Sequence, residues 1–150
     1  MDPNDSADAE GPSKRVLVEK DLSHAIVACF FEVYNALGYG FLESMYARAL
    51  EITMRRRGLR VEREYPVAVI FEGHQIGFHR VDMLVERRVI VEVKSTERLP
   101  GSAHCQLRSY VKAMNLELGL LLHFGPAPKF HRQLRRRNPL AAGNHSDSFG

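Results

Sequence analysis

The sequence has only two cysteines, Cys29 and Cys105, among its 150 residues. Both stand inside apolar patterns, which predicts small core residues rather than a disulfide or a metal site. Two cysteines are also too few for an iron–sulfur cluster that is held within one chain. The cysteine usage therefore favours a reducing, cytoplasmic compartment.

Long apolar runs are also missing. No stretch approaches the roughly 20 apolar residues that a membrane helix needs, so no membrane partner is expected. The first stretch, MDPNDSADAEGPSKR, is acidic and polar without an apolar segment, which argues against a secretory signal. There is no internal repeat and no linker in the middle of the sequence. These absences predict one domain at residues 19–137, between a disordered acidic tail at 1–18 and a second disordered tail at 138–150.

Charge is unevenly distributed along the chain, whose formal net charge is +3. Acidic residues gather in the predicted N-terminal tail, whereas basic residues gather in MRRRGLR (54–60) and KFHRQLRRR (129–137). The body of the protein is therefore more basic than the chain as a whole, which suits a polyanionic partner. The alternative is that these basic clusters are ordinary solvent-exposed faces of a helix and a tail.

The apolar periodicity predicts an α/β fold. Three segments have helical spacing: residues 22–37, 41–57 and 102–115. Residues 61–95 are rich in strand formers, with turns at Glu72-Gly73 and at 86–88, and residues 117–125 form a last apolar strand. The order is α-α-β-β-β-α-β, which predicts a mixed sheet of about four strands flanked by helices. In the second helix the inward residues are expected to be Leu42, Met45, Ala49, Leu50 and Ile52.

The strand VIVEVKS (89–95) carries two charged residues, Glu92 and Lys94, among β-branched ones. A hairpin turn centred on Arg87 would place Asp82 opposite Glu92 on the neighbouring strand. Asp82, Glu92 and Lys94 would then share one face with Leu84 and Ile90. The other face would be wholly apolar and buried: Val81, Met83, Val85, Val89, Val91 and Val93.

Two carboxylates at opposed strand positions repel each other unless a positive charge lies between them. Lys94 is one candidate for that charge. A divalent cation is another, because paired carboxylates suit Mg²⁺ and leave positions open for water and phosphate. An ordinary surface ion pair with Lys94 is the simpler alternative.

Two further pairs of residues share a helix face. Glu43 and Tyr46 are three residues apart in GFLESMY, and Gln106 and Tyr110 are four apart in CQLRSY. A glutamate in the first turn of a helix is also favoured by the helix dipole alone. Likewise, the second pair is compatible with a polar helix flank and a half-buried tyrosine.

The histidines do not form a site by their spacing. His79 precedes Asp82 by three residues, so in a regular strand it points to the opposite face. Five others are scattered along the predicted domain: His24, His74, His104, His123 and His131. Each is expected to lie at the surface or to fill the core, and a Zn²⁺ site has little support.

Four motifs follow one another in the sequence: Gly40-x-x-Glu43-x-x-Tyr46, Arg80-x-Asp82, Glu92-x-Lys94 and Gln106-x-x-x-Tyr110. Together they resemble the GxxExxY protein family, a branch of the PD-(D/E)XK nuclease superfamily, over about residues 20–125. The resemblance implies a restriction-endonuclease-like core of order α-β-β-β-α-β, which agrees with the order predicted above. Val81 stands before Asp82, where this superfamily often has proline.

The resemblance also implies an activity, namely that of a nuclease dependent on Mg²⁺ or Mn²⁺ that hydrolyses nucleic acid, with DNA favoured over RNA. It implies metal binding by Asp82, Glu92, Glu43 and the backbone carbonyl of Val93. Lys94 would position or activate the attacking water. The implied catalytic set is Glu43, Asp82, Glu92, Lys94 and Gln106, and the implied nucleic-acid contacts are Tyr46, Arg80, Gln106 and Tyr110.

Two alternatives accompany this hypothesis. The basic runs, together with the lack of a separate specificity domain, suit a non-catalytic nucleic-acid-binding or regulatory module of the same fold. The second alternative is a structural interaction protein that forms a homodimer.

Overall fold

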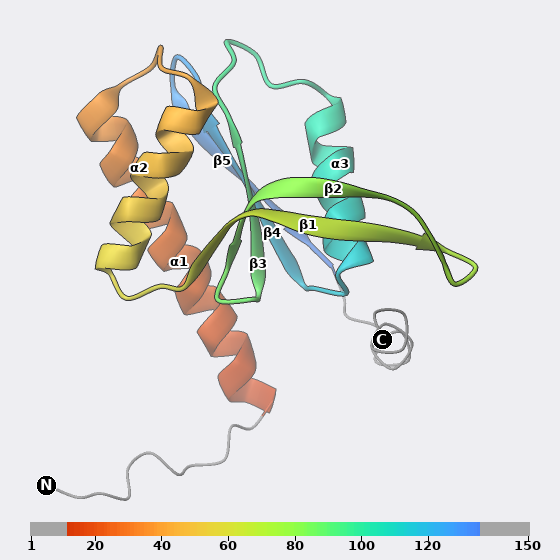
Figure 1. Cartoon of the computed structure of the whole chain (residues 1–150). Coiled ribbons are helices and arrows are strands. Elements are labelled where there is room, and N and C mark those ends of the chain that lie inside the picture. Colours follow the sequence, from red (N-terminus) through yellow and green to blue (C-terminus); the bar gives the residue numbers. More distant parts are fainter. Residues whose placement is uncertain (1–11, 136–150) are drawn as a thin grey trace, which may run out of the picture.

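The computed structural model describes residues 12–135 of the 150-residue chain. Its elements follow in the order α1 (Pro12–Leu37), α2 (Glu43–Arg56), β1 (Val61–Phe71), β2 (His74–Val85), β3 (Val89–Lys94), α3 (Ser102–Ala113), β4 (Leu118–Phe124) and β5 (Pro128–Leu134) (Figure 1). The predicted order α-α-β-β-β-α-β is confirmed, and a further strand, β5, follows it.

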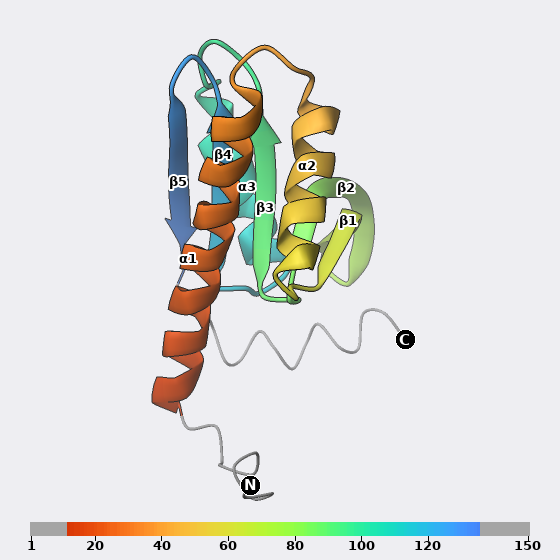
Figure 2. The same ribbon diagram turned by 90° about the vertical axis from the view of Figure 1, so that its left-hand side faces the viewer.

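The strands form one mixed sheet with helices on both faces. The order across the sheet is β1-β2-β3-β4-β5, and only the β3–β4 pair is parallel. Figure 2 shows α1 and α2 on the near face, with α3 behind β3 and β4. Because α3 connects the two parallel strands, it forms the predicted crossover. The sheet therefore separates two hydrophobic clusters, one under α1 and α2 and one under α3.

The inward face of α2 differs from the predicted one. Its buried residues are Tyr46, Ala47, Leu50, Thr53 and Met54. By contrast, three residues predicted to be inward are largely exposed: Leu42 (65%), Met45 (50%) and Ile52 (48%). The buried set follows the i, i+4, i+7, i+8 spacing of one helix face. The prediction counted mainly aliphatic residues and left out Tyr46 and Thr53. It therefore assigned the wrong face of the helix to the core.

The helix α1 begins earlier than the sequence indicated. Residues 12–18 were assigned to a disordered tail, but α1 starts at Pro12. Proline is favoured in the first turn of a helix, and leucine, lysine and glutamate in the residues that follow are good helix formers. The remaining tail predictions concern residues 1–11 and 136–150, which lie outside the described residues.

The strand β5 comes from a segment that was predicted only as a basic run. It pairs antiparallel with β4, with Phe130 opposite Leu122 and Arg132 opposite Leu120. Phe130 packs its ring edge-on against Phe31 of α1, with centroids 6.0 Å apart. The cationic residues Lys129 and Arg132, together with the arginines that follow the strand in the sequence, hide its strand pattern.

The β1–β2 hairpin changes faces part of the way along its length. The ladder lacks the Glu64–Asp82 pair, and Glu64 has a positive φ of 50°. On the side of this point nearer to β3, Met83 packs under α1 and α2. On the side nearer to the tip of the hairpin, Val81 packs under α3. The prediction that Val81 and Met83 share a face was therefore wrong. In Figure 1 the far part of the hairpin runs across α3.

The two cysteines differ in their surroundings. Both are free; Cys29 is buried in the core as predicted, whereas Cys105 is exposed. Cys105 lies on α3 between the buried Ala103 and Leu107, on a side of the helix that faces away from the sheet. Among the residues that the structure describes, no helix is long and apolar enough to cross a membrane.

Candidate active site

A pocket of about 140 Å³ brings together side chains that are far apart in the sequence. Seven predicted site residues line it: Glu43, Arg80, Asp82, Glu92, Lys94, Gln106 and Tyr110. They come from α2, β2, β3 and α3. The remaining lining residues are His79, Ala103, Leu107 and Leu121. Two predicted residues, Tyr46 and Val93, do not line the pocket.

The register of the β2–β3 hairpin explains how Asp82 reaches the site. Val85 pairs with Val89 and Met83 with Val91, as predicted for a turn about Arg87. The ladder ends at Met83, however, because β2 bends away there. The backbone N–H of Val93 then donates a hydrogen bond of 2.7 Å to Asp82 Oδ2. The Asp82 carboxylate thus takes the place of a strand partner, and this contact holds it beside the end of β3.

Glu92 is the most perturbed acid of the site, with 9% of its surface exposed. Burial raises its pKa to about 9, and the nearby Asp82 carboxylate adds to the rise, while Lys94 opposes it. Among the described residues, no hydrogen-bond partner reaches Glu92 Oε1. A buried acceptor without a donor is costly. This oxygen is therefore available to a ligand that carries positive charge.

Glu43 connects α2 to the end of β3. It lies in the first turn of α2, as predicted, and is the first residue of that helix, where no side chain forms a cap. Its Oε1 accepts a hydrogen bond of 3.3 Å from the backbone N–H of Ser95. The carboxylate consequently lies at the pocket, next to the strand that carries Glu92 and Lys94.

Tyr46 was predicted to contact nucleic acid, but it is fully buried. Its ring stacks on Phe124, with centroids 4.1 Å apart. Its hydroxyl donates a hydrogen bond to the carbonyl of Gly38 and accepts one of 3.2 Å from the N–H of Phe41. Tyr46 therefore fixes the loop before α2, and through it the position of Glu43, without reaching the surface.

The remaining predicted residues surround the two acids. Lys94 follows Glu92 by two residues in β3 and is half-buried at the same pocket. Gln106 and Tyr110 lie on one face of α3, as their spacing predicted. Arg80 lies on the exposed part of β2, with its guanidinium carbon 5.8 Å from the centre of the Phe78 ring. The lining of the pocket thus combines its carboxylates with two cationic side chains, Arg80 and Lys94.

His79 lies in the pocket, which is contrary to the prediction. Its ring stacks on Tyr110, and its Nε2 is 3.8 Å from Glu92 Oε1. The prediction assumed regular alternation between His79 and Asp82, but the irregularity opposite Glu64 breaks that alternation. A positive φ at a glutamate within a strand gives no signal in the sequence.

The donor set at this pocket suits a hard divalent cation. Within residues 12–135, no three His, Cys, Asp or Glu side chains come together closely enough to hold a metal ion by themselves. Mg²⁺ needs no such cage, because it keeps several waters and binds through one or two carboxylates plus substrate phosphates. Asp82 and Glu92, with the unpartnered Oε1 of Glu92, fit that mode.

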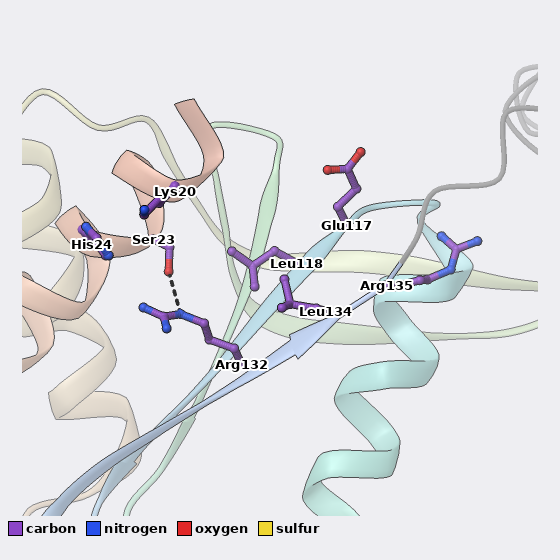
Figure 3. Close-up of a pocket in the computed structure, with 8 residues that line it drawn as sticks. All are labelled: Lys20, Ser23, His24, Glu117, Leu118, Arg132, Leu134 and Arg135. Carbon is purple, nitrogen blue, oxygen red and sulfur yellow. Dashed lines mark hydrogen bonds between the residues drawn. The ribbon is translucent and has the colours of Figure 1, made fainter. Parts of the chain in front are cut away.

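A larger cavity, of about 320 Å³, contains none of the predicted residues (Figure 3). It lies between α1 and the ends of β4 and β5. Its lining is Lys20, Ser23, His24, Glu117, Leu118, Arg132, Leu134 and Arg135. Arg132 donates a hydrogen bond of 3.2 Å to Ser23 Oγ. With a single carboxylate in its lining, this cavity lacks the paired acids that the smaller pocket has.

The arginines of the basic run at 54–60 form ion pairs, but with fewer acids than there are arginines. Arg56 and Arg57 pair with Glu32, and Arg60 pairs with Glu62. These partly exposed pairs lower the net positive charge that the run would offer to a polyanion. The run therefore keeps a net positive charge, although these ion pairs reduce what it offers to a polyanion.

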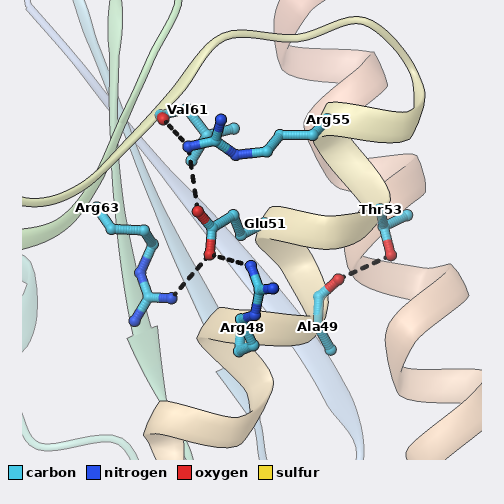
Figure 4. A network of polar contacts seen from close by, with 7 residues as sticks. All are labelled: Arg48, Ala49, Glu51, Thr53, Arg55, Val61 and Arg63. Carbon is cyan, nitrogen blue, oxygen red and sulfur yellow. Dashed lines mark hydrogen bonds and ion pairs between the residues drawn. The ribbon is translucent and has the colours of Figure 1, made fainter.

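Glu51 is the centre of a second group of ion pairs, which ties α2 to β1 (Figure 4). It contacts Arg48, Arg55 and Arg63 at 2.8, 3.1 and 3.4 Å. Partial burial alone would raise the pKa of Glu51, but the hydrogen bond from Arg48 and the three guanidinium charges lower it overall. This network supports the start of the hairpin that carries Asp82.

A comparison with models of protein families agrees with this arrangement at the level of the superfamily. The family model described as PD-(D/E)XK nuclease superfamily matches residues 20–137. A solved structure described as "Crystal structure of SSO0001" is 15% identical, with a TM-score of 0.48, and the match covers 91% of this chain and 69% of that chain. No curated protein matches the sequence.

Proposed function

The chain belongs to the PD-(D/E)XK nuclease superfamily, and from that premise we propose that it is a metal-dependent nuclease that hydrolyses phosphodiester bonds at the pocket of Asp82, Glu92 and Lys94. DNA is the proposed polymer. Assignment to the GxxExxY branch stays a prediction from the four motifs, since the matching model is that of the whole superfamily.

One observation carries the proposal. Glu92 is a buried acid beside Asp82, its pKa is raised to about 9, and no donor satisfies its Oε1 among the described residues. In the protein alone this arrangement keeps the proton on Glu92, and a bound cation can replace that proton, balance the charge of both carboxylates and contact the unsatisfied Oε1. Strongly perturbed acids in a pocket are typical of functional sites.

Each residue has a role that follows from its place. Asp82 and Glu92 would hold the cation, with the backbone carbonyl of Val93 as a further ligand and Glu43 completing the acidic side. Lys94, at the same pocket, would orient the attacking water and offset the charge that develops on the phosphate. Gln106 and Tyr110 would steady the substrate from α3, and Arg80 would contact a phosphate from β2.

The cation itself would lower the pKa of a bound water and stabilise negative charge on the phosphate. Two hydrogen bonds hold the acids in place for such a cation. The Val93 N–H donates to Asp82, and the Ser95 N–H donates to Glu43. Both carboxylates keep a second oxygen for other ligands.

A cleavage assay tests the proposal. We expect the purified protein to cut labelled oligonucleotides in Mg²⁺ or Mn²⁺ and to be inactive in EDTA. Lys94→Ala should lower the rate by about a hundredfold or more, since removing one group that stabilises charge in the transition state typically costs this much. Single-stranded and duplex DNA and RNA are compared in parallel.

A matched control is Lys112→Ala, which removes an exposed lysine of α3 outside the pocket. It should leave the rate unchanged. Equal activity of wild type and Lys94→Ala, or cleavage that does not depend on a metal, would contradict the proposal. Salt-sensitive binding without cleavage would favour the non-catalytic module instead.

A further inference from the structure

His79 presents an aromatic ring at the mouth of the pocket. The ring lies parallel to that of Tyr110, with centroids 4.3 Å apart and an angle of 4° between the planes. The His79 side chain is nevertheless 45% exposed. Tyr110 therefore covers one face of the ring, while a large part of the side chain stays exposed. A ring held in this way loses little side-chain entropy when another ring stacks on it.

The position of the ring relates it to the chemistry. His79 Nε2 lies 3.8 Å from Glu92 Oε1, which is too far for a hydrogen bond. Stacking on Tyr110, and not Glu92, therefore orients the ring. A group that stacks on the open side of His79 lies beside the carboxylate that would hold the cation, and so beside the phosphate that would be cut.

The surroundings favour an unpaired strand. The pocket, at about 140 Å³, is too small for a base pair. Residues 74–80 of β2 are exposed at every position, and Arg80, which follows His79 there, also lines the pocket. Aromatic rings interleaved with cationic groups are typical of surfaces that bind single strands, where bases stack and phosphates pair with the cations.

From these contacts we propose that His79 is a substrate-stacking residue and that the pocket takes single-stranded nucleic acid, with the base next to the cleaved phosphate stacked on the His79 ring. The proposal rests on the proposed nuclease function. In a duplex the faces of the bases are covered by their neighbours, so an unpaired nucleotide can use this ring and a paired one cannot.

Fluorescence anisotropy tests the proposal, with a labelled single strand and a blunt duplex of the same sequence. Ca²⁺ replaces Mg²⁺, and a gel verifies that the DNA stays intact. The wild type should bind the single strand more tightly than the duplex. His79→Ala should weaken single-strand binding roughly tenfold, as expected for the loss of one stacking contact, and should leave duplex binding unchanged.

Two matched variants make the test specific. His79→Phe keeps an aromatic ring on Tyr110, so it should retain most of the affinity. His74→Ala removes an exposed histidine of the same strand outside the pocket, and it should behave as wild type. Thermal unfolding of each variant verifies the fold. Equal affinity of wild type for both DNAs, or equal effects of His79→Ala and His79→Phe, would overturn the proposal.

The cleavage assay separates this proposal from the proposed function. If wild type cuts and Lys94→Ala does not, but His79→Ala cuts single and double strands at unchanged rates, the stacking role alone fails. If single-strand binding depends on an aromatic ring at position 79 but no metal supports cleavage, the nuclease proposal fails and the single-strand site stands.

Discussion

At the scale of single residues, Glu92 is subject to two opposite demands. The metal-free fold favours its protonated form, whereas binding a cation requires the ionised form. Its surroundings keep the proton on the carboxyl group: it is buried, and Asp82 lies beside it. In the unfolded chain the same carboxyl ionises near its ordinary pKa of 4.5. The folded state, with a pKa of about 9, binds the proton more tightly than the unfolded state does. Glu92 therefore stabilises the metal-free fold most at acidic pH; this contribution declines as the pH rises above about 4.5 and is fully lost once the pH passes about 9.

Glu92→Gln should for this reason make the metal-free protein more stable at alkaline pH relative to wild type. The glutamine keeps the shape and does not ionise. Between pH 5 and pH 8.5 the difference in free energy of unfolding should move in favour of the variant by about 1–3 kcal/mol. Urea unfolding in EDTA at several pH values measures it.

The control for this prediction is Glu97→Gln, which removes an exposed carboxyl group just after β3. A difference between wild type and Glu92→Gln that stays constant from pH 5 to pH 8.5 would contradict the account of Glu92. Mg²⁺ should stabilise wild type more than Glu92→Gln, because binding to the folded state alone raises stability.

The residues that carry charge in the site were accessible from the sequence, whereas their surroundings were not. The register expected for a short hairpin placed Asp82 near Glu92 and Lys94, and the three line one pocket, although the ladder ends at Met83 and Asp82 bonds to the Val93 N–H and is not a ladder partner of Glu92. Tyr46 illustrates the limit. Its motif position indicated a site residue, but only packing against Phe124 shows that it is buried. Burial depends on non-local contacts, which a local pattern does not contain.

At the scale of elements, the loop before α2 decides where Glu43 lies. The Tyr46 hydroxyl bridges the Gly38 carbonyl and the Phe41 N–H. Without it, two backbone groups lose their partner in a partly buried place, which is costly. The loop would then hold the first residue of α2 less firmly.

Tyr46→Phe should therefore lower the free energy of unfolding by about 1–2 kcal/mol and should also lower cleavage, because Glu43 loses its support. Chemical denaturation and the oligonucleotide assay measure the two effects on the same samples. Tyr39→Phe is the matched control, since Tyr39 lies in the same loop and is 45% exposed. If both variants unfold at the same denaturant concentration, the proposed role of the Tyr46 hydroxyl is wrong.

Two elements departed from the sequence prediction for reasons that are physical. The β1–β2 hairpin changes faces at Glu64, so strict alternation failed beyond Asp82 and His79 was assigned to the wrong side. The strand β5 pairs with β4 through a segment of cationic residues, and its edge position lets those side chains remain in water. Tertiary pairing overrides local composition in both cases.

At the scale of the whole molecule, the pocket exists only when four elements meet. α2 contributes Glu43, β2 contributes Asp82, β3 contributes Glu92, and α3 contributes Gln106. Close approach of α3 to β4 depends on Gly119, where an added Cβ would lie 2.7 Å from Val111 Cγ2. The sheet with helices on both faces is therefore what converts separate motifs into one site.

The central claim is that Asp82 and Glu92 together hold a divalent cation. The most direct test is a crystal of the protein grown with Mn²⁺ and measured for anomalous scattering. We expect one ion between the carboxylates of Asp82 and Glu92, within reach of the Val93 carbonyl, and we expect it to be lost in Glu92→Gln but kept in Glu72→Gln, which changes an exposed residue of the hairpin turn. A crystal with no ion between Asp82 and Glu92 at saturating Mn²⁺, or an ion that is unaffected by Glu92→Gln, would contradict the claim.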